Sequence, residues 1–336
     1  MIDRRTFHRR IAQAGLASAT AGLWTGCTSR EELPADGPAG ASRTMTIGMI
    51  AKSQSNPVFL AARRGAEHQA RQRSESGDVE VKLDWRTPND EDAQKQAEFI
   101  EQLVAAGADA ITIACSDASK VTRTIDDAIA KGAVVMCFDS DAPESKRLCY
   151  VGTDDVDAGR QVMRGVANLL EGQPGVIAIL AGNQTATNLQ KRVRGAEEEL
   201  QQHENLQLKD VYYHKETPQD AYAMVESVQK ANPEINGWAM IGGWPLMTDR
   251  ALPWQPGAVK CVSMDTLPQQ LEHLRMGDVQ LLLGQRYFEF GQQCVDILVD
   301  KVLNGKDTAK TVDFRPLDPV TGENVNEYAK NWDVWS

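Results

Sequence analysis

The sequence lacks the features of several common classes of protein. The body of the chain contains no block of Lys or Arg, and the formal net charge is −11 over 336 residues. Nucleic-acid binding needs a clustered basic face, so no nucleic-acid partner is expected. The negative charge is interpreted as a source of solubility. With 42% hydrophobic residues, the chain can still form a substantial core in one or two domains.

Catalytic and metal-binding motifs are also missing. The sequence contains no G-x-S-x-G, no G-x-x-x-x-G-K, no G-x-G-x-x-G and no H-E-x-x-H. The five His residues are scattered without the spacing that metal ligands show. We therefore expect no metal, no cofactor and no enzymatic activity.

Cysteines are few, and their pattern is not that of a redox or metal motif. Apart from Cys27 there are five, an odd number without a Cys-x-x-Cys, namely Cys115, Cys137, Cys149, Cys261 and Cys294. Several lie in or just after apolar runs, so they are interpreted as small buried hydrophobic residues. A single disulfide remains an alternative in an oxidising compartment.

No long apolar run is suited to span a membrane, but the N-terminus has the pattern of an export signal. A basic start precedes the uncharged, weakly apolar segment 11–26. Arg4-Arg5-Thr6-Phe7 resembles the twin-arginine export pattern. Thr25-Gly26-Cys27 resembles the end of a bacterial lipobox, although Trp24 stands where Leu is usual.

This pattern predicts a lipid-anchored protein on the periplasmic side of the cytoplasmic membrane. Residues 1–27 would form the export signal, and Cys27 would carry the lipid. Residues 28–43, rich in Pro, Gly, Ala and Ser, are predicted to form a flexible tether.

From residue 44 onward, short β-rich runs alternate with helical patterns. Strands are predicted at 44–51, 79–85, 108–114, 134–138, 148–152, 176–180, 207–213, 237–241, 260–264 and 280–284. Helices are predicted at about 57–74, from an Asn89-Asp90 cap to Gly107, and at 119–130, 155–171, 186–203, 218–231, 244–251, 267–276 and 287–303.

Strands separated by single helices form βαβ units, and their near-continuous apolar runs indicate burial on both faces. The fold class is therefore α/β with parallel sheets. Ten or eleven strands favour two sheets over one, and a (β/α)₈ barrel is the alternative architecture.

Polar side chains follow the strands at their carboxyl ends, where open α/β sheets bind ligands. The run VVMCFDSDAP places Asp139 and Ser140 directly after a buried strand, and Asp265 and Gln285 follow two later strands. Carboxylates accept hydrogen bonds from adjacent hydroxyls, whereas Arg donates to their oxygens. This inventory suits a sugar or a related neutral polyol. A helix cap or a surface loop is the alternative interpretation of Asp139.

Five segments in order resemble periplasmic sugar-binding proteins of the ribose-binding type, which feed ABC transporters: TIGMIAKSQSNPVF, VVMCFDSDA, RVRGAEEEL, VSMDTLPQQL and LLLGQRYFEFG. The resemblance covers about residues 44–314. It implies the periplasmic-binding-protein-like I fold, with two doubly wound parallel-sheet lobes joined by a three-segment hinge. By this similarity, the N-terminal lobe would be 44–153 plus 286–314, and the C-terminal lobe 154–285 plus 315–336.

The resemblance also implies a set of ligand-binding residues, namely Lys52, Asn56, Phe59, Asp139, Arg192, Asp265 and Gln285. The sequence departs from ribose binders at Val58, which replaces a second Phe, and at Ser140, which replaces Arg. Gly242 replaces an Asn, and the region of Glu216 lacks the expected aromatic residue. Trp244 is predicted to cover the other face of the sugar, with core packing as its alternative. These departures argue against ribose as the specific ligand, and the predicted class of ligand is still a sugar or a similar molecule.

The function implied is capture of a small sugar by hinge closure, followed by delivery to an ABC-transporter permease by a monomeric binding protein. A receptor subunit that presents the sugar to a membrane sensor kinase is the main alternative. A transcription regulator would need an upstream DNA-binding helix-turn-helix, where this chain has an export signal. A glycoside hydrolase would need two carboxylates at the scissile bond, a role that Asp139 and Asp265 could imitate.

Overall fold

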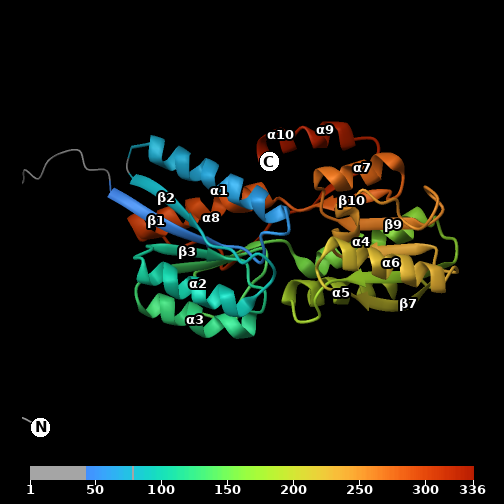
Figure 1. Ribbon diagram of the computed structural model, residues 1–336, viewed down its shortest axis with the longest axis horizontal. Coiled ribbons are helices and arrows are strands. Elements are labelled where there is room, and N and C mark those ends of the chain that lie inside the picture. The colour runs from blue at the N-terminus through green and yellow to red at the C-terminus, as the bar shows by residue number, and fades with distance from the viewer. Residues whose placement is uncertain (1–42, 78) are drawn as a thin grey trace, which may run out of the picture. The chain divides into compact units, whose positions relative to one another are not determined.

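The computed structural model describes residues 43–77 and 79–336. The predicted export signal, the lipidated Cys27 and nearly all of the predicted tether lie outside the described residues. Within the described residues, no helix is both long enough and apolar enough to span a bilayer. These residues form two six-stranded sheets, each covered by helices (Figure 1).

The first sheet has the strand order β11-β5-β4-β3-β1-β2, and all its neighbouring strands are parallel. Its strands are β1 (Arg43–Ile50), β2 (Val79–Trp85), β3 (Ala110–Ile113), β4 (Val134–Phe138), β5 (Tyr150–Gly152) and β11 (Val312–Phe314). β3 and β4 are almost entirely buried, as continuous apolar runs in a parallel sheet require.

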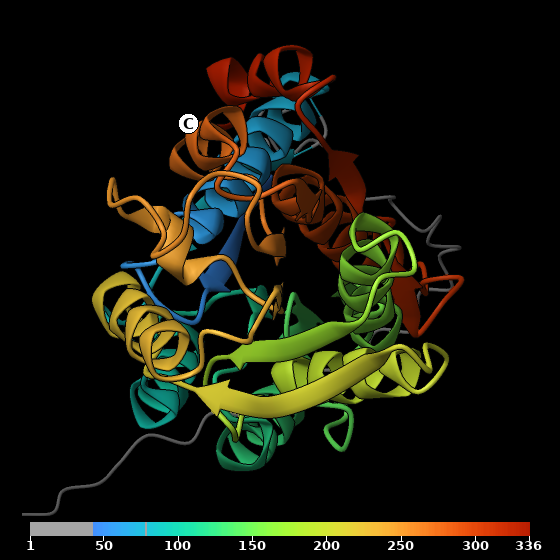
Figure 2. The same cartoon turned by 90° about the vertical axis from the view of Figure 1, so that its right-hand side faces the viewer.

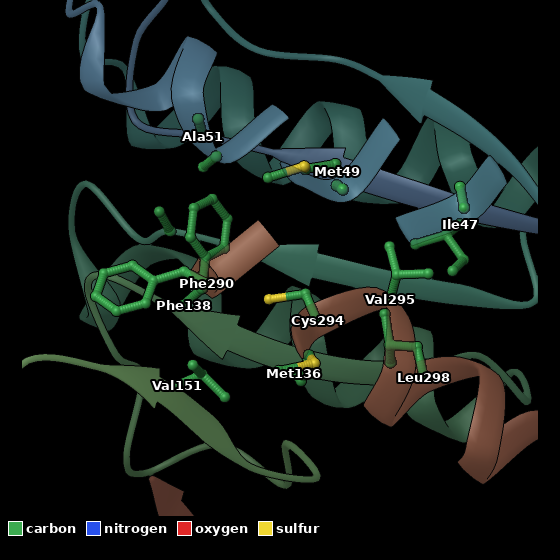
Figure 3. Packing of buried hydrophobic residues seen from close by; sticks show 14 of the residues in the cluster. Ile47, Met49, Ala51, Met136, Phe138, Val151, Phe290, Cys294, Val295 and Leu298 are labelled. Carbon is green, nitrogen blue, oxygen red and sulfur yellow. The ribbon is translucent and has the colours of Figure 1, made fainter. Parts of the chain in front are cut away.

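Helices cover both faces of this sheet. α1 (Val58–Glu75) and α8 (Tyr287–Asn304) lie together on one face, whereas α2 (Ala93–Ala105) and α3 (Ala118–Ala130) lie on the other (Figure 1). Figure 3 shows α8 directing Phe290 and Leu298 toward the strands that carry Met49 and Met136. α1 and α8 approach closely at Gly291, which has no side chain. A Cβ at this position would lie 1.9 Å from the carbonyl oxygen of Ala62.

The second sheet has the order β12-β10-β9-β8-β6-β7 and is parallel except for β12, which runs antiparallel to β10. Its strands are β6 (Gly175–Ala181), β7 (Leu206–Tyr213), β8 (Gly237–Met240), β9 (Lys260–Met264), β10 (Leu281–Gly284) and β12 (Asp318–Val320). Figure 2 shows the yellow edge strand β7 beside the light-green β6. The helices that cover the two faces are α4 (Asp155–Leu169) with α5 (Thr187–Leu200), and α6 (Pro218–Ala231) with α7 (Pro268–Met276).

The chain passes between the two sheets three times. It leaves the first sheet after β5, returns after β10, and leaves again between β11 and β12. We call the first sheet with α1, α2, α3 and α8 the first lobe, and the second sheet with α4 to α7 the second lobe. The predicted fold class of two doubly wound lobes is confirmed, and the alternative barrel is excluded, because the strands form two open sheets.

Three details of the prediction are wrong. The described residues contain twelve strands, since β11 and β12 are three residues each and too short to leave a periodic pattern. The helix predicted at 244–251 is only a short 3₁₀ helix, η1 (Trp244–Met247). The residue that caps α2 is Asp92, whose carboxylate accepts from the Lys95 amide at 2.9 Å, and not Asn89-Asp90.

The C-terminal segment contacts both lobes through aromatic side chains. It forms α9 (Val325–Ala329) and α10 (Trp332–Trp335), and α10 packs near α1 of the first lobe (Figure 1). The Trp332 indole donates to the carbonyl of Thr266 in the second lobe at 2.7 Å. The Trp335 ring stacks on Phe288 at a centroid distance of 6.4 Å. This segment therefore joins the lobes beside the crossing segments.

The five cysteines of the described residues are buried and free. The sulfur atoms of Cys115 and Cys137 lie 3.9 Å apart, well beyond the length of a disulfide bond. The interpretation of these residues as small buried hydrophobic groups is confirmed for the residues that the structure describes.

Candidate functional site

Two acidic residues occupy equivalent positions in the two lobes. Asp139 follows β4 and Asp265 follows β9, each with a positive φ, of 57° and 70° respectively. Each backbone amide donates to the neighbouring strand, Asp139 to Val151 at 3.0 Å and Asp265 to Leu283 at 2.9 Å. This conformation costs on the order of 1–3 kcal/mol, so the surrounding sheet must hold it. Strained backbone of this kind is typical of functional sites.

Both carboxylates are buried, with exposed fractions of 2% for Asp139 and 7% for Asp265. Burial raises the pKa of each, against the opposing effect of nearby cations. Asp139 is therefore neither a helix cap nor part of a surface loop, and that alternative interpretation is wrong.

A chain of hydrogen bonds connects the two acids. The Tyr287 hydroxyl donates to Oδ1 of Asp139 at 2.9 Å and accepts from Nε2 of Gln285 at 2.9 Å. The same Gln285 nitrogen donates to Oδ1 of Asp265 at 2.8 Å. Gln285 lies where the chain crosses from the second lobe to the first, so it links the acids of both lobes.

Arg192 joins this chain from the second lobe and is only 3% exposed. Its Nε donates to Oδ1 of Asp155 at 2.9 Å, and a terminal nitrogen donates to Oε1 of Gln285 at 2.9 Å. The Thr153 hydroxyl donates to the same oxygen at 3.0 Å. Burial raises the pKa of Asp155 to about 6, although Arg192 opposes this shift. Burial acts to lower the pKa of Arg192, but the surrounding acidic groups, Asp155 above all, raise it.

We call these seven residues the central network: Asp139, Thr153, Asp155, Arg192, Asp265, Gln285 and Tyr287. Each of their side chains makes at least one hydrogen bond to another member of the set.

A second group of polar side chains lies at the same strand ends. Lys52 is 3% exposed, and its ammonium lies 2.9 Å from Oε1 of Glu91 and 3.6 Å from Oε2 of Glu216. Lys52 and Glu91 belong to the first lobe and Glu216 to the second, so this ion pair connects the lobes. Burial raises the pKa of Glu91, although the Lys52 charge opposes this.

His214 and Trp244 complete this second group from the second lobe. Their rings meet edge to face, with centroids 5.0 Å apart and an interplanar angle of 75°. The Trp244 ring also fills the space above Gly242, where a Cβ would lie 1.9 Å from a ring carbon. The Gly that stands at 242 thus makes room for the indole. We call Lys52, Glu91, His214, Glu216 and Trp244 the rim cluster.

Three members of the rim cluster, Glu91, His214 and Glu216, line a cavity of about 770 Å³ to which both lobes contribute. The first lobe contributes Ser53, Ser55, Asp90 and Glu91, and the second lobe contributes residues of 182–185 and 213–217, including His214 and Glu216. In the part of the chain that the structure describes, no group of His, Cys, Asp or Glu is arranged to hold a metal ion. The residues that line the cavity offer hydrogen-bond donors and acceptors to a polar ligand.

A model of the periplasmic binding protein domain matches residues 47–307. The chain belongs to the periplasmic binding protein family. The resemblance inferred from the five sequence segments is therefore confirmed. Proteins of this family bind solutes and are not enzymes.

Two curated relatives are each 28% identical over part of their length. The ribose import binding protein of Bacillus subtilis (strain 168) matches over 156 residues, 46% of this chain and 48% of that protein. The D-ribose/D-allose-binding protein of Pseudomonas aeruginosa matches over 193 residues, 56% of this chain and 58% of that protein. The chain spans about half the length of the curated relatives it matches.

Solved structures of solute-binding proteins share the fold. A Burkholderia graminis protein in complex with D-arabinose has a TM-score of 0.78 at 24% identity, covering 86% of this chain and 99% of that one. A glucose-galactose binding protein from Geobacillus stearothermophilus has a TM-score of 0.76 at 22% identity, covering 84% and 99%. These likenesses extend over both lobes and support the two-lobe fold of this binding protein.

The structure brings four of the predicted site residues of this binding protein into one network: Asp139, Arg192, Asp265 and Gln285. Lys52 and Trp244 lie in the rim cluster instead. Trp244 is 6% exposed and packs in the hydrophobic core of the second lobe, as its alternative interpretation predicted. That these residues bind a ligand stays a prediction.

The other three predicted residues have more local environments. The Asn56 side chain accepts from the Val58 amide at 3.2 Å, at the start of α1. Phe59 lies in the hydrophobic core of the first lobe, edge-on to Tyr287 at 5.9 Å. Ser140 is 1% exposed, beside Asp139. Ring stacking by Phe59 stays a prediction, although its position beside Tyr287 places it next to the central network.

Sequence reasoning missed several members of this arrangement. Tyr287 and Asp155 resemble ordinary first residues of helices, since α8 and α4 begin at them. Glu91 and His214 lie in loops without any motif. For Tyr287 and Asp155, the available signal in the sequence was their position, since each lies within two residues of a segment that crosses between the lobes.

Proposed function

We propose that this protein captures a small sugar or a related polyol between its two lobes. The observation that carries the proposal is the linkage of Asp139, from the first lobe, to Asp265 and Arg192, from the second, through Tyr287 and Gln285. Buried carboxylates accept hydrogen bonds from adjacent hydroxyls, and a guanidinium donates to their oxygens. Relatives named for ribose and allose, and similar structures that hold D-arabinose or myo-inositol, support this ligand class.

Capture proceeds by closure of the lobes about the three crossing segments. A ligand that contacts both lobes only in the closed form shifts the population toward closure. The moving bodies are 44–153 plus 286–314 and 154–285 plus 315–336. Thr153 and Gln285, at two of the crossings, hydrogen-bond to each other at 3.0 Å and so couple the hinge to the central network.

The remaining proposed contacts surround the central network. From the first lobe, Lys52, Asn56 and Ser140 donate to sugar oxygens and Phe59 covers an apolar sugar face. Trp244 closes the site from the second lobe. The closed form then delivers the sugar to the membrane permease of an ABC transporter.

The N-terminal pattern and the family support a site of action outside the cytoplasm. We infer export, by the twin-arginine route, to the periplasmic side of the cytoplasmic membrane. The Thr25-Gly26-Cys27 pattern supports attachment through a lipid on Cys27. The binding protein acts there as a monomer.

A thermal-shift screen tests the proposal with D-ribose, D-allose, D-arabinose, D-galactose and myo-inositol. A sugar present at one hundred times its dissociation constant should stabilise the protein by about 2.7 kcal/mol. Titration calorimetry then measures the strongest binder against Asp139→Ala, which should bind more weakly by roughly 2 kcal/mol or more.

Asp127→Ala is the matched control, because the Asp127 side chain is 61% exposed on α3. It should bind as the unmodified protein does. If no sugar or polyol shifts the melting temperature, the proposed function is wrong. If Asp139→Ala binds with unchanged affinity, Asp139 does not contact the ligand.

A further inference from the structure

Four side chains that are more than nine-tenths buried carry a polar atom without a hydrogen-bond partner among the described residues. They are Ser116 and Ser140 in the first lobe and His214 and Trp244 in the second. A buried polar atom without a partner costs about 1–3 kcal/mol, so native structures rarely keep one without a reason. Two such atoms in each lobe point to a partner from outside the chain.

All four residues follow strands at the carboxyl edges of their sheets. Ser116 and Ser140 follow β3 and β4, and the loops that carry them touch, because the Cys115 amide donates to the Ser140 carbonyl at 3.0 Å. His214 and Trp244 follow β7 and β8, with their rings in contact at 5.0 Å. The four residues thus fall into one neighbouring pair in each lobe, at the edges that the central network occupies.

The tautomer of His214 follows from its surroundings. Its Nδ1 lies 2.5 Å from the carbonyl oxygen of Lys215, which can only accept, so Nδ1 carries the hydrogen. Burial lowers the pKa of His214, which favours the neutral ring. Nε2 is then a bare acceptor. Nε1 of Trp244 is a donor only, so the two rings in contact carry one unpaired acceptor and one unpaired donor.

A hydroxyl group satisfies such a pair because it donates and accepts at once. An ionised carboxylate or phosphate group only accepts, and it would leave Nε2 of His214 facing another acceptor. The cations of the site are also already engaged. Lys52 contacts Glu91 and Glu216, and Arg192 contacts Asp155.

The charge balance of the site further opposes an anionic ligand. Five carboxyl groups belong to the central network and the rim cluster, Glu91, Asp139, Asp155, Glu216 and Asp265, against the two cations Lys52 and Arg192. The pKa of each of these carboxyl groups except Glu216 is raised by burial, so the site already disfavours negative charge. An added negative charge would therefore be disfavoured even if its hydrogen bonds could be made.

We propose that His214 and Trp244 form a specificity pair that binds a hydroxyl group of an uncharged polyol and discriminates against sugar acids and sugar phosphates. This inference rests on the proposed function and narrows its ligand class. Trp244 acts through its indole N–H, held in place by its packing over Gly242 and against His214.

The first experiment is a thermal-shift comparison of matched probes. The pairs are D-ribose with ribose 5-phosphate, D-galactose with D-galacturonate, D-glucose with D-glucuronate, and myo-inositol with an inositol monophosphate. The largest stabilisation should come from an uncharged member, and its charged counterpart should give a much smaller shift. A charged probe as the strongest binder would overturn the inference but leave sugar capture standing. If no probe stabilises the protein, the proposed function fails, and the inference fails with it.

The second experiment measures the strongest uncharged probe against variants by titration calorimetry. Trp244→Phe keeps an aromatic ring and removes the N–H, and His214→Phe removes the acceptor. Each should weaken binding about tenfold, which corresponds to about 1.4 kcal/mol. His214→Gln, whose amide oxygen can accept, should retain more affinity than His214→Phe and serves if the latter fails to fold.

Trp254→Phe is the matched control, because the Trp254 indole donates to the Asp278 carbonyl at 3.1 Å within the core of the second lobe. It should lower the melting temperature without changing the affinity. Wild-type affinity in both Trp244→Phe and His214→Phe, or equal losses in His214→Gln and His214→Phe, would overturn the role of the pair.

Discussion

The central network and the rim cluster lie at the same sheet edges but differ in how their polar atoms are used. In the central network, Gln285 accepts from Thr153 and Arg192 and donates to Asp265 and Tyr287, so its amide is fully occupied. In the rim cluster, Nε2 of His214 and Nε1 of Trp244 have no partner among the described residues. The central network therefore fixes its own geometry, while the rim cluster keeps these two polar atoms available for a partner from outside the chain.

This difference separates two tasks that a binding site must perform. A network of mutual hydrogen bonds fixes the direction of each carboxylate before a ligand arrives, which reduces the ordering cost of binding. The unpaired polar atoms beside this network then favour a ligand that can form hydrogen bonds with them. The central network should accordingly dominate stability, and the rim cluster should dominate selectivity.

The largest expected effect is loss of stability when Arg192 is removed. Arg192→Ala leaves Asp155 buried without its cation and should lower the free energy of unfolding by about 3–5 kcal/mol, measured by urea denaturation. The control is Arg160→Ala, because the Arg160–Glu198 pair also joins α4 to α5 at 2.5 Å but is about 40% exposed. It should cost less than about 1 kcal/mol. Equal effects of the two would remove the distinction between buried and exposed pairs.

The next largest effect is expected at Gly242, which makes room for the Trp244 ring of the rim cluster. Gly242→Ala places a methyl group within the Trp244 ring, so it should destabilise the protein by roughly 2 kcal/mol. Trp244→Ala removes the ring, so Gly242→Ala should be nearly neutral when it is made in the Trp244→Ala protein. A double-mutant cycle by urea denaturation measures this coupling. Strictly additive effects would show that Gly242 is constrained by something other than the indole.

A smaller loss is expected when one bond of the central network is deleted. Tyr287→Phe leaves Oδ1 of Asp139 without its donor and should reduce the free energy of unfolding by about 1–2 kcal/mol. Tyr213→Phe, at an exposed tyrosine of β7, should change it by less than about 0.5 kcal/mol. If the two variants are equally stable, the network contributes little to folding.

The smallest effect is a dependence of stability on pH. Burial lowers the pKa of His214 in the folded state relative to its ordinary value of 6.5. The stability that neutral His214 contributes is therefore fully present above pH 6.5 and is lost as pH falls through the folded-state pKa. The free energy of unfolding of the wild type, minus that of His214→Gln, should decrease between pH 8 and pH 5.

Asp155 titrates in the opposite sense in this pH range. Burial raises its pKa to about 6, so its contribution is present below its ordinary value of 3.8 and is lost as pH rises through 6. The contribution of Asp155 cancels when the wild type is compared with His214→Gln, because both proteins contain Asp155. A difference in stability that stays constant with pH would show that His214 titrates alike in the folded and unfolded chains.

Much of the architecture could be predicted because it depends on local patterns. The buried runs at 134–138 and 260–264 end where β4 and β9 end, so the residues that follow them were correctly placed at strand ends. Where the pattern was weak the prediction failed, as in the three-residue strand β11 and in the helix predicted after Trp244. Short elements are stabilised by their neighbours and leave little trace in the sequence.

By itself, the amino-acid sequence determined the α/β class, the order of its elements and the acids at the tips of the strands. Apolar periodicity and helix ends are properties of neighbouring residues, and they can be read along the chain. Which strand ends lie close to one another was decided only by the tertiary structure. Asp139 contacts Tyr287 across 148 positions, and Lys52 meets Glu216 only because two separate sheets bring their edges together. Such contacts depend on the packing of whole lobes, which no local stretch of sequence encodes.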